Sequence, residues 1–172
     1  MLNKGYIQVY TGNGKGKTTA ALGLTLRTIC AGNKVFFGQF MKGQSYSELK
    51  AMEFLPNLKM EQFGDVNFVN GAPSAKDIEN GKKGLERIKE VLLSDEYDVV
   101  VCDELNMAMF FKILDVKDVL EVLKLKPEKT ELILTGRYAP EEIVDYADLV
   151  TEMKEIKHYF NAGVDSRIGI ED

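Results

Sequence analysis

The sequence predicts a three-layer α/β fold, in which a mainly parallel central sheet of about six strands is covered by helices on both faces. Apolar, β-branched or aromatic runs alternate with helical patterns through most of the 172 residues. Strands that are separated by helices connect through right-handed crossovers, which give a parallel sheet. A glycine-rich turn joins the first apolar run to the first helical pattern. No linker or repeat interrupts the sequence, so we expect one domain over residues 1–172.

Each expected element follows from its local pattern. The run Tyr6–Tyr10 places the first strand at 5–11, and the apolar spacing after the turn places the first helix at 17–31. Further strands are expected at 34–41, 59–63, 97–103, 130–135 and 148–153. Further helices are expected at about 45–55, 74–94, 115–124 and 140–146.

Three of these helices begin at recognisable signals. Ser74 stands three residues before Asp77, a spacing that resembles a capping box. Asp115 and Asp118 repeat this spacing, and Pro140 suits the first turn of the last helix. These residues support the expected helix starts.

Composition limits the classes of function that the chain can serve. Hydrophobic residues make up 45% and charged residues 28%, as in ordinary soluble globular proteins. The net charge is −5 with no block of like charge, which argues against a general nucleic-acid surface. The sequence has no run of 18 apolar residues and no signal-peptide pattern, so we expect a cytoplasmic protein without membrane association.

Cysteine and histidine carry no recognisable chemistry. Cys30 and Cys102 fall in apolar segments, and we expect two buried thiols in a reducing compartment. No Cys/His cluster has the spacing of metal ligands. The single histidine, His158, lacks a paired serine or cysteine signature, which argues against a hydrolytic triad.

The turn before the first helix predicts a site for a nucleoside triphosphate. It consists of Gly12, Asn13, Gly14, Lys15, Gly16, Lys17, Thr18 and Thr19. Glycines let successive backbone N–H groups point toward phosphate oxygens, and the helix adds its positive dipole end. Lys17 supplies a cation, and the Thr18 hydroxyl can reach a magnesium ion. A turn without a ligand is the alternative, but a solvated turn has little use for this pattern of glycines and lysines.

This motif departs from the usual pattern, G-x-x-x-x-G-K-[ST]. Thr11 stands where the first glycine is expected, and the glycines occupy positions 12, 14 and 16 instead. A second lysine, Lys15, lies inside the turn.

An apolar run that ends in two acids predicts a magnesium site. The run Val99–Cys102 is followed by Asp103 and Glu104, the form of a Walker B segment, in which acids face the metal directly or through water. A strand that ends in a solvated acidic turn is the alternative. Sequence does not decide which acid touches the metal. Glu104 has two readings, because an acid here orients the attacking water in many ATPases and only binds magnesium in other P-loop enzymes.

Three more polar residues fall at the carboxyl ends of expected strands, where ligands gather in parallel sheets. Arg137 could clamp phosphate or carboxylate, and Lys42 reaches the same edge. Gln39 lies there too, although a buried structural role suits it equally. The alternative for Arg137 is an ordinary ion pair with Asp145, Asp148 or Glu152.

Seven segments follow one another along the chain: the glycine-rich turn 12–19, 39–43 (Gln-Phe-Met-Lys-Gly), 103–105 (Asp-Glu-Leu), 135–137 (Thr-Gly-Arg), 147–153 (Ala-Asp-Leu-Val-Thr-Glu-Met), 157–163 (Lys-His-Tyr-Phe-Asn-Ala-Gly) and 169–171 (Gly-Ile-Glu). Together they resemble the ATP:corrinoid adenosyltransferases of cobalamin biosynthesis and salvage. The resemblance spans nearly the whole chain and is much more specific than the glycine-rich turn alone.

The resemblance implies a RecA-like P-loop fold, usually a homodimer, that transfers the 5′-deoxyadenosyl group of ATP to Co(I) of a corrinoid and releases triphosphate. It also implies Mg²⁺, a flavodoxin-like reductant that supplies Co(I), and a nucleotide held in the reverse direction from ordinary P-loop NTPases. By family pattern, Thr18 and Glu104 bind magnesium. Asp103 either supports these ligands without touching the metal or is itself an alternative ligand. The choice between cobalamin and an incomplete corrinoid stays open, as does that between biosynthesis and salvage.

The chain departs from the family pattern in two places. Only four residues precede Gly5, whereas longer members carry an N-terminal segment that folds over the site, so we expect a more open pocket or cover from the partner subunit. Members also place bulky aromatics after the third strand, where they exclude the lower axial ligand of cobalt. Here that loop offers Phe68, with Val69 near a position that is aromatic elsewhere. Phe68 is therefore the candidate for the lower corrinoid face, and a loop-anchoring core phenylalanine is the alternative.

Two other classes of function fit the same motifs. A P-loop kinase or ATPase would transfer the γ-phosphate and use Glu104 toward water or an acceptor hydroxyl. A nucleotide-dependent binding module would hold a corrinoid without chemistry. The reaction products distinguish all three.

Overall fold

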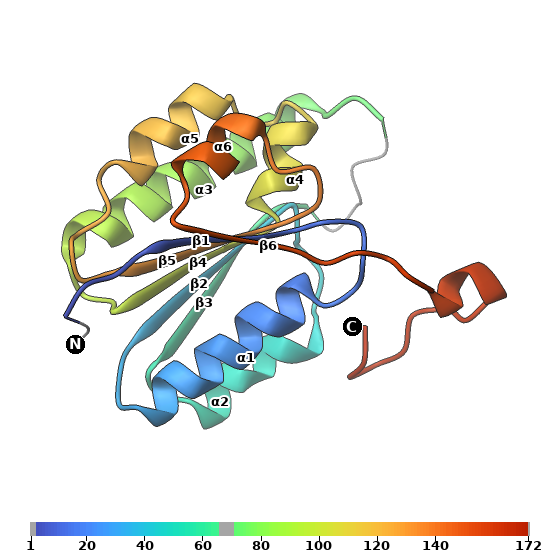
Figure 1. Ribbon diagram of the computed structural model, residues 1–172, viewed down its shortest axis with the longest axis horizontal. Coiled ribbons are helices and arrows are strands. Elements are labelled where there is room, and N and C mark those ends of the chain that lie inside the picture. Colours follow the sequence, from blue (N-terminus) through green and yellow to red (C-terminus); the bar gives the residue numbers. More distant parts are fainter. Residues whose placement is uncertain (1–2, 66–70, 172) are drawn as a thin grey trace.

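The computed structural model describes residues 3–65 and 71–171, and its centre is a six-stranded parallel sheet (Figure 1). The strands are β1 (Ile7–Thr11), β2 (Val35–Phe40), β3 (Leu58–Phe63), β4 (Val99–Asp103), β5 (Glu131–Thr135) and β6 (Leu149–Glu152). Across the sheet they lie in the order β3-β2-β4-β5-β1-β6, and every neighbouring pair is parallel. The edges of the sheet are therefore β3 and β6.

Helices cover both faces of this sheet (Figure 1). On one face lie α1 (Lys17–Cys30) and the short α2 (Ala51–Phe54); on the other lie α3 (Ala75–Ser94), α4 (Leu105–Phe110), α5 (Val116–Leu123) and α6 (Glu141–Tyr146). There are also two 3-10 segments in the described residues: η1 (Ser47–Lys50) precedes α2, and η2 (Tyr159–Ala162) follows β6. Within the described ranges, every helix is too short or too polar to cross a membrane. The three layers confirm the predicted α/β fold.

The core consists of two clusters because side chains alternate along the central strands. In β2, Phe36 and Phe40 pack on the α3 side of the sheet, whereas Val35 and Phe37 pack with Ala21 of α1. All residues of β2 and β4 are buried, as central parallel strands covered on both faces should be. The residues of β6 are all exposed, which fits an edge strand.

The expected strands and most expected helices are present, with small shifts at their ends. Ser74 caps α3 in a complete capping box with Asp77, whereas Asp115 caps α5 through the Lys117 N–H. The helix expected at about 45–55 is split into η1 and α2. The sequence analysis did not foresee α4. Only its N-cap residue, Glu104, separates this six-residue helix from β4, and no side chain caps it.

One expectation about the cysteines was wrong. Cys102 is fully buried in β4, as predicted, but Cys30 is exposed. The buried residues of α1 form one stripe along the helix (Lys17, Ala21, Thr25 and Thr28), and Cys30, its last residue, lies outside this stripe. Only Cys102 therefore contributes to the core.

Candidate nucleotide-binding site

The glycine-rich turn links β1 to α1 at the carboxyl edge of the sheet. Backbone conformation explains two of its glycines, and close packing explains the third. Gly12 and Gly16 have φ of 95° and 118°, in the left-handed region that favours glycine. Gly14 has no such φ, but a Cβ there would lie 2.8 Å from the carbonyl oxygen of Met153. The Gly14 N–H also donates to this oxygen at 2.7 Å, and the Met153 N–H donates to the Thr11 carbonyl at 2.8 Å. The chain that continues β6 therefore lies directly against the turn.

Lys17 lies inside the turn and is almost fully buried. Its ammonium donates to the carbonyl oxygens of Gly12 and Gly14, both at 2.8 Å. Burial is the largest influence on the Lys17 ammonium and lowers its pKa, while the nearby Glu104 carboxylate acts in the opposite direction. Lys17 thus places a positive charge at the centre of the turn, where a phosphate chain would lie.

Lys15, the second lysine of the turn, faces the C-terminal tail instead. Its Nζ donates to the Ile170 carbonyl at 3.2 Å and lies 3.6 Å from a carboxylate oxygen of Glu171. Glu171 is held in turn by Arg167 and Tyr159. Figure 1 shows the segment after β6 leaving the sheet and the chain end returning beside α1. Asn13 and Thr19 are exposed, as is Lys15 itself.

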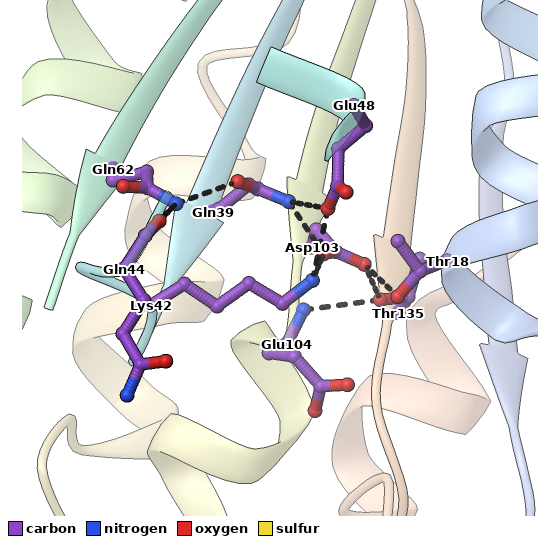
Figure 2. A network of polar contacts seen from close by, with 9 residues as sticks. All are labelled: Thr18, Gln39, Lys42, Gln44, Glu48, Gln62, Asp103, Glu104 and Thr135. Atoms are coloured by element: carbon purple, nitrogen blue, oxygen red, sulfur yellow. Dashed lines mark hydrogen bonds and ion pairs between the residues drawn. The ribbon is translucent and has the colours of Figure 1, made fainter. Parts of the chain in front are cut away.

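Asp103 is the centre of a buried polar network of side chains from α1, β2, β4 and β5 (Figure 2). It is the last residue of β4 and has no exposed surface. Its Oδ1 accepts the Thr18 hydroxyl at 2.8 Å and the Thr135 hydroxyl at 2.6 Å. Its Oδ2 accepts the Lys42 ammonium at 2.9 Å and the Gln39 amide at 3.4 Å. Both oxygens of Asp103 are therefore occupied by protein donors.

Glu104 follows Asp103 but points elsewhere. Its φ of 58° is in the left-handed region, which turns the chain sharply from β4 into α4. Among the residues that the structure describes, its carboxylate has no hydrogen bond or ion pair, and Figure 2 shows it directed away from the network. Burial, and next the charge of Asp103, raise the pKa of Glu104. Of the two acids, Glu104 is the one whose oxygens are open to a ligand.

Lys42 and Gln39 lie in the network from the β2 side. The Lys42 ammonium is 2.9 Å from Asp103 and 3.6 Å from Glu48, with only 16% of its side chain exposed. Burial lowers the pKa of Lys42, but the nearby carboxylates, first Asp103 and then Glu48 and Glu104, together raise it by more, so that it lies above its ordinary value. Gln39 is completely buried and donates to Glu48 at 2.9 Å, while its own carbonyl oxygen accepts Gln62 at 3.1 Å. Two of the predicted edge residues, Lys42 and Gln39, thus meet at Asp103, with Lys42 paired to acids.

A family model described as ATP:corrinoid adenosyltransferase BtuR/CobO/CobP matches residues 3–171. The chain belongs to the ATP:corrinoid adenosyltransferase family. It is 37% identical to the corrinoid adenosyltransferase of Sinorhizobium sp over 172 residues, covering 98% of this chain and 80% of that protein. It is 32% identical to the corrinoid adenosyltransferase of Escherichia coli and 34% identical to the corrinoid adenosyltransferase CobA of Salmonella typhimurium, covering 98% of this chain and 86% of each relative. The resemblance seen in the sequence is thereby confirmed.

Solved structures support the fold of this adenosyltransferase family member. The RadB recombinase superposes with a TM-score of 0.57 at 13% identity, covering 91% of this chain and 78% of that one. A KaiC-like protein from Pyrococcus horikoshii superposes with a TM-score of 0.57 at 21% identity, covering 88% and 73%. At such identities the likeness concerns the fold alone, and it confirms the RecA-like P-loop arrangement.

Two other predicted residues of the adenosyltransferase stand apart from the network. Arg137 is exposed and forms no ion pair with any described residue, so the alternative of a pairing with Asp145, Asp148 or Glu152 is not found in the described part of the chain. Asp148 accepts the Ile7 N–H at 2.8 Å instead. Arg137 is close enough that its positive charge acts to lower the pKa of Lys17 and of Glu104. Phe68 and Val69 lie outside the described residues.

The donor set suits a magnesium ion that is bound together with phosphate. In the described ranges, His, Cys, Asp and Glu form no group of three that could hold a metal unaided. Magnesium, however, commonly takes one or two protein oxygens and fills its octahedron with phosphate and water. The Glu104 carboxylate is open, and the Thr18 hydroxyl gives its proton to Asp103, so its oxygen lone pairs remain for a metal. Thr18 and Glu104 therefore fit this role better than Asp103.

Sequence reasoning missed several members of this network, among them Glu48, Gln62 and Thr135. Glu48 lies in η1 and Gln62 on the edge strand β3, and no motif or periodicity marked either residue. Thr135 was recognised as part of the 135–137 segment but not as a site residue. Its position at the end of β5, next to the end of β4, is the signal that could have identified it.

Proposed function

We propose that this chain transfers the 5′-deoxyadenosyl group of ATP to the Co(I) centre of a corrinoid and releases triphosphate. The observation that carries the proposal is the family match over residues 3–171, together with relatives that bear this activity in their names. The site supports it because cationic and amide donors gather at the carboxyl edge of the sheet, where a triphosphate would bind.

The reaction asks the protein mainly to bind and to stabilise charge. The cobalt electron pair forms the Co–C bond to the ribose C5′, the C5′–O bond breaks, and its electrons leave with the triphosphate. No proton is transferred, so the step requires neither a protein nucleophile nor a general base. Charge develops on the leaving triphosphate, and fixed positive groups stabilise such charge best when they are positioned beforehand.

Each residue of the site has a proposed role in this step. Lys17, the free N–H groups of the turn and the N-terminus of α1 hold the triphosphate. Thr18 and Glu104 bind Mg²⁺, which stabilises the leaving group. Asp103 orients Thr18 by accepting the hydrogen bond of its hydroxyl. Arg137 is exposed beside Lys17 and Glu104, and it supplies a further cation to the phosphate chain.

Several parts of the proposal rest on family resemblance alone. These are the reversed direction of the nucleotide, the homodimer, the flavodoxin-like reductant and the contact of Phe68 with the lower corrinoid face. The proposed cytoplasmic location rests instead on the sequence pattern, which shows neither a long apolar run nor a signal peptide. The open carboxylate of Glu104 also suits a second function, γ-phosphate transfer, in which this acid would orient water or an acceptor hydroxyl.

Products decide between these functions. The protein is incubated with ATP, Mg²⁺ and chemically reduced cob(I)alamin, and both adenosylcobalamin and triphosphate are measured. We expect the two products in equal amounts and no product from Lys17→Ala. The exposed Lys117→Ala on α5 is the control and should match the wild type. ADP and phosphate formed without corrinoid would show that the enzyme is a kinase or ATPase, and binding without products would show a non-catalytic module.

A further inference from the structure

Thr135 connects the two acids of the site. It is the last residue of β5, and its side chain is completely buried. The register of β4 and β5 pairs Cys102 with Leu134, which brings the next residues, Asp103 and Thr135, side by side. The Thr135 hydroxyl donates to Asp103 Oδ1 at 2.6 Å and accepts the Glu104 N–H at 3.0 Å (Figure 2).

These contacts fix the direction of the hydroxyl protons. A backbone N–H only donates and an ionised carboxylate only accepts, so the single proton of Thr135 points to Asp103. The Thr18 hydroxyl lies 2.8 Å from the same carboxylate oxygen and must also donate to it. The lone pairs of Thr18 therefore face away from Asp103 and remain free for a ligand. Thr135 thus helps to hold the carboxylate that orients Thr18.

Thr135 acts on Glu104 through the backbone. Glu104 has a left-handed conformation that is unfavourable for a residue with a side chain, and it lies at the N-cap of α4 without a side-chain cap. Its N–H finds the Thr135 hydroxyl as acceptor. This hydrogen bond stabilises the turn that directs the Glu104 carboxylate away from Asp103. One hydroxyl therefore positions both proposed magnesium ligands.

We propose that Thr135 is a positioning residue for the binding of magnesium with ATP. It touches neither ligand, but it sets the orientation of Thr18 through Asp103 and the orientation of Glu104 through its backbone. The inference rests on the proposed function only in taking Mg²⁺ and ATP as the ligands. It predicts that loss of the Thr135 hydroxyl weakens the contribution of Mg²⁺ to ATP affinity. The contacts that Lys17 and the turn make with phosphate should not change.

The test uses the near-isosteric substitution Thr135→Val and its conservative partner Thr135→Ser. Calorimetry measures ATP affinity with excess Mg²⁺ and again with EDTA. Groups behind metal ligands typically contribute about 10–100-fold to metal affinity, so we expect Thr135→Val to lose about 10–100-fold of the affinity gained with Mg²⁺. ATP affinity in EDTA should stay unchanged, and Thr135→Ser should restore most of the gain because it keeps the hydroxyl.

A matched control lies at the other end of the same strand. Thr130 precedes β5, is 2% exposed, and donates its hydroxyl to the Tyr97 carbonyl at 3.3 Å, away from the site. Thr130→Val makes the same buried change and should leave the magnesium-dependent affinity unaltered. Circular dichroism checks folding of each variant, and Thr135→Ala replaces Thr135→Val in the comparison if the latter does not fold.

Three results would overturn the inference. They are a normal magnesium-dependent gain in Thr135→Val, an equal loss of ATP affinity with Mg²⁺ and with EDTA, and an equal loss in Thr130→Val. The proposed function can fail separately. If the wild type binds ATP with Mg²⁺ but forms no adenosylcorrinoid, the reaction is refuted, while calorimetry still decides the role of Thr135.

Discussion

At the scale of single residues, the site is defined by which polar atoms are already occupied. Asp103 accepts from four side chains, whereas the carboxylate of Glu104 accepts from none of the described residues. Two adjacent acids thus have different tasks, because one is surrounded by donors and the other is not. Sequence alone could not separate them, since the difference depends on the neighbours that β2 and β5 supply.

This difference makes Asp103 important for stability as well as for ligand binding. In Asp103→Asn, an amide NH₂ replaces one acceptor among four donors, and Lys42 loses the negative charge of its closest partner. Hydrogen bonds to charged groups typically contribute about 1.5–3 kcal/mol, so we expect the free energy of unfolding to fall by about 2–3 kcal/mol in urea denaturation. Asp118→Asn, an exposed change on α5, should alter it by less than about 0.5 kcal/mol. Equal stability of Asp103→Asn and wild type would contradict this account.

At the scale of elements, the chain that follows β6 packs against the glycine-rich turn and constrains its sequence. Gly14 needs no left-handed φ, and its missing side chain makes room for the Met153 carbonyl. The sequence analysis attributed the alternating glycines to phosphate alone. It could not foresee this packing, because the path of the chain after β6 depends on tertiary structure and not on residue types near the turn.

Two glycines in the same part of the chain test this reading. A Cβ at position 14 would lie 2.8 Å from the Met153 carbonyl oxygen, whereas nothing lies within 4 Å of a Cβ at Gly23, inside α1. Gly14→Ala must shift backbone, and such overpacking costs about 1–3 kcal/mol. Gly23→Ala should instead stabilise by about 0.5–1 kcal/mol, because alanine favours the helix. Thermal denaturation measures both, and similar effects of the two substitutions would refute the packing argument.

The C-terminal tail is a second element whose order depends on one side chain. Glu171 accepts from Arg167 and Tyr159 and lies near Lys15. The hydrogen bonds from Arg167 and then Tyr159 lower the pKa of Glu171 to about 2. The ionised Glu171 carboxylate therefore stabilises the tail. This stabilisation is complete at pH values above the ordinary carboxyl pKa and is lost as the pH falls toward 2. The contacts of the tail should therefore be intact at pH 5.

Hydrogen exchange can follow this dependence. Arg167 donates its backbone N–H to Glu171, and the Ile170 N–H donates back to the Arg167 carbonyl. In Glu171→Gln, the protection factors of these amides should fall severalfold, because the charge that strengthens the hydrogen bonds is lost. In the wild type they should stay constant from pH 7 to pH 5. Glu121→Gln on α5, where Glu121 pairs with Lys124, is the control and should leave the tail unchanged. Loss of wild-type protection between pH 7 and pH 5 would contradict the assignment.

At the scale of the whole molecule, the parallel sheet brings distant segments to one edge. Thr18, Lys42, Asp103 and Thr135 are far apart in sequence, yet each follows or ends a strand or begins a helix at that edge. Strand ends could therefore be predicted to meet from periodicity and the rules of parallel sheets. Glu48 could not, because η1 and its contact with Lys42 depend on how the chain between β2 and β3 folds back.

This edge also couples ligand binding to the stability of the fold. Lys17, Thr18 and Glu104 come from the turn after β1 and the end of β4, so a ligand bound across them favours the folded sheet over the unfolded chain. At ATP and Mg²⁺ concentrations about 100-fold above the dissociation constant, the gain is about 2.7 kcal/mol, which for a domain of this size raises the melting temperature by about 5–10 °C. Lys17→Ala should lose most of this rise while folding normally without ligand, whereas the exposed Lys117→Ala should keep it. An undiminished rise in Lys17→Ala would show that the triphosphate binds elsewhere.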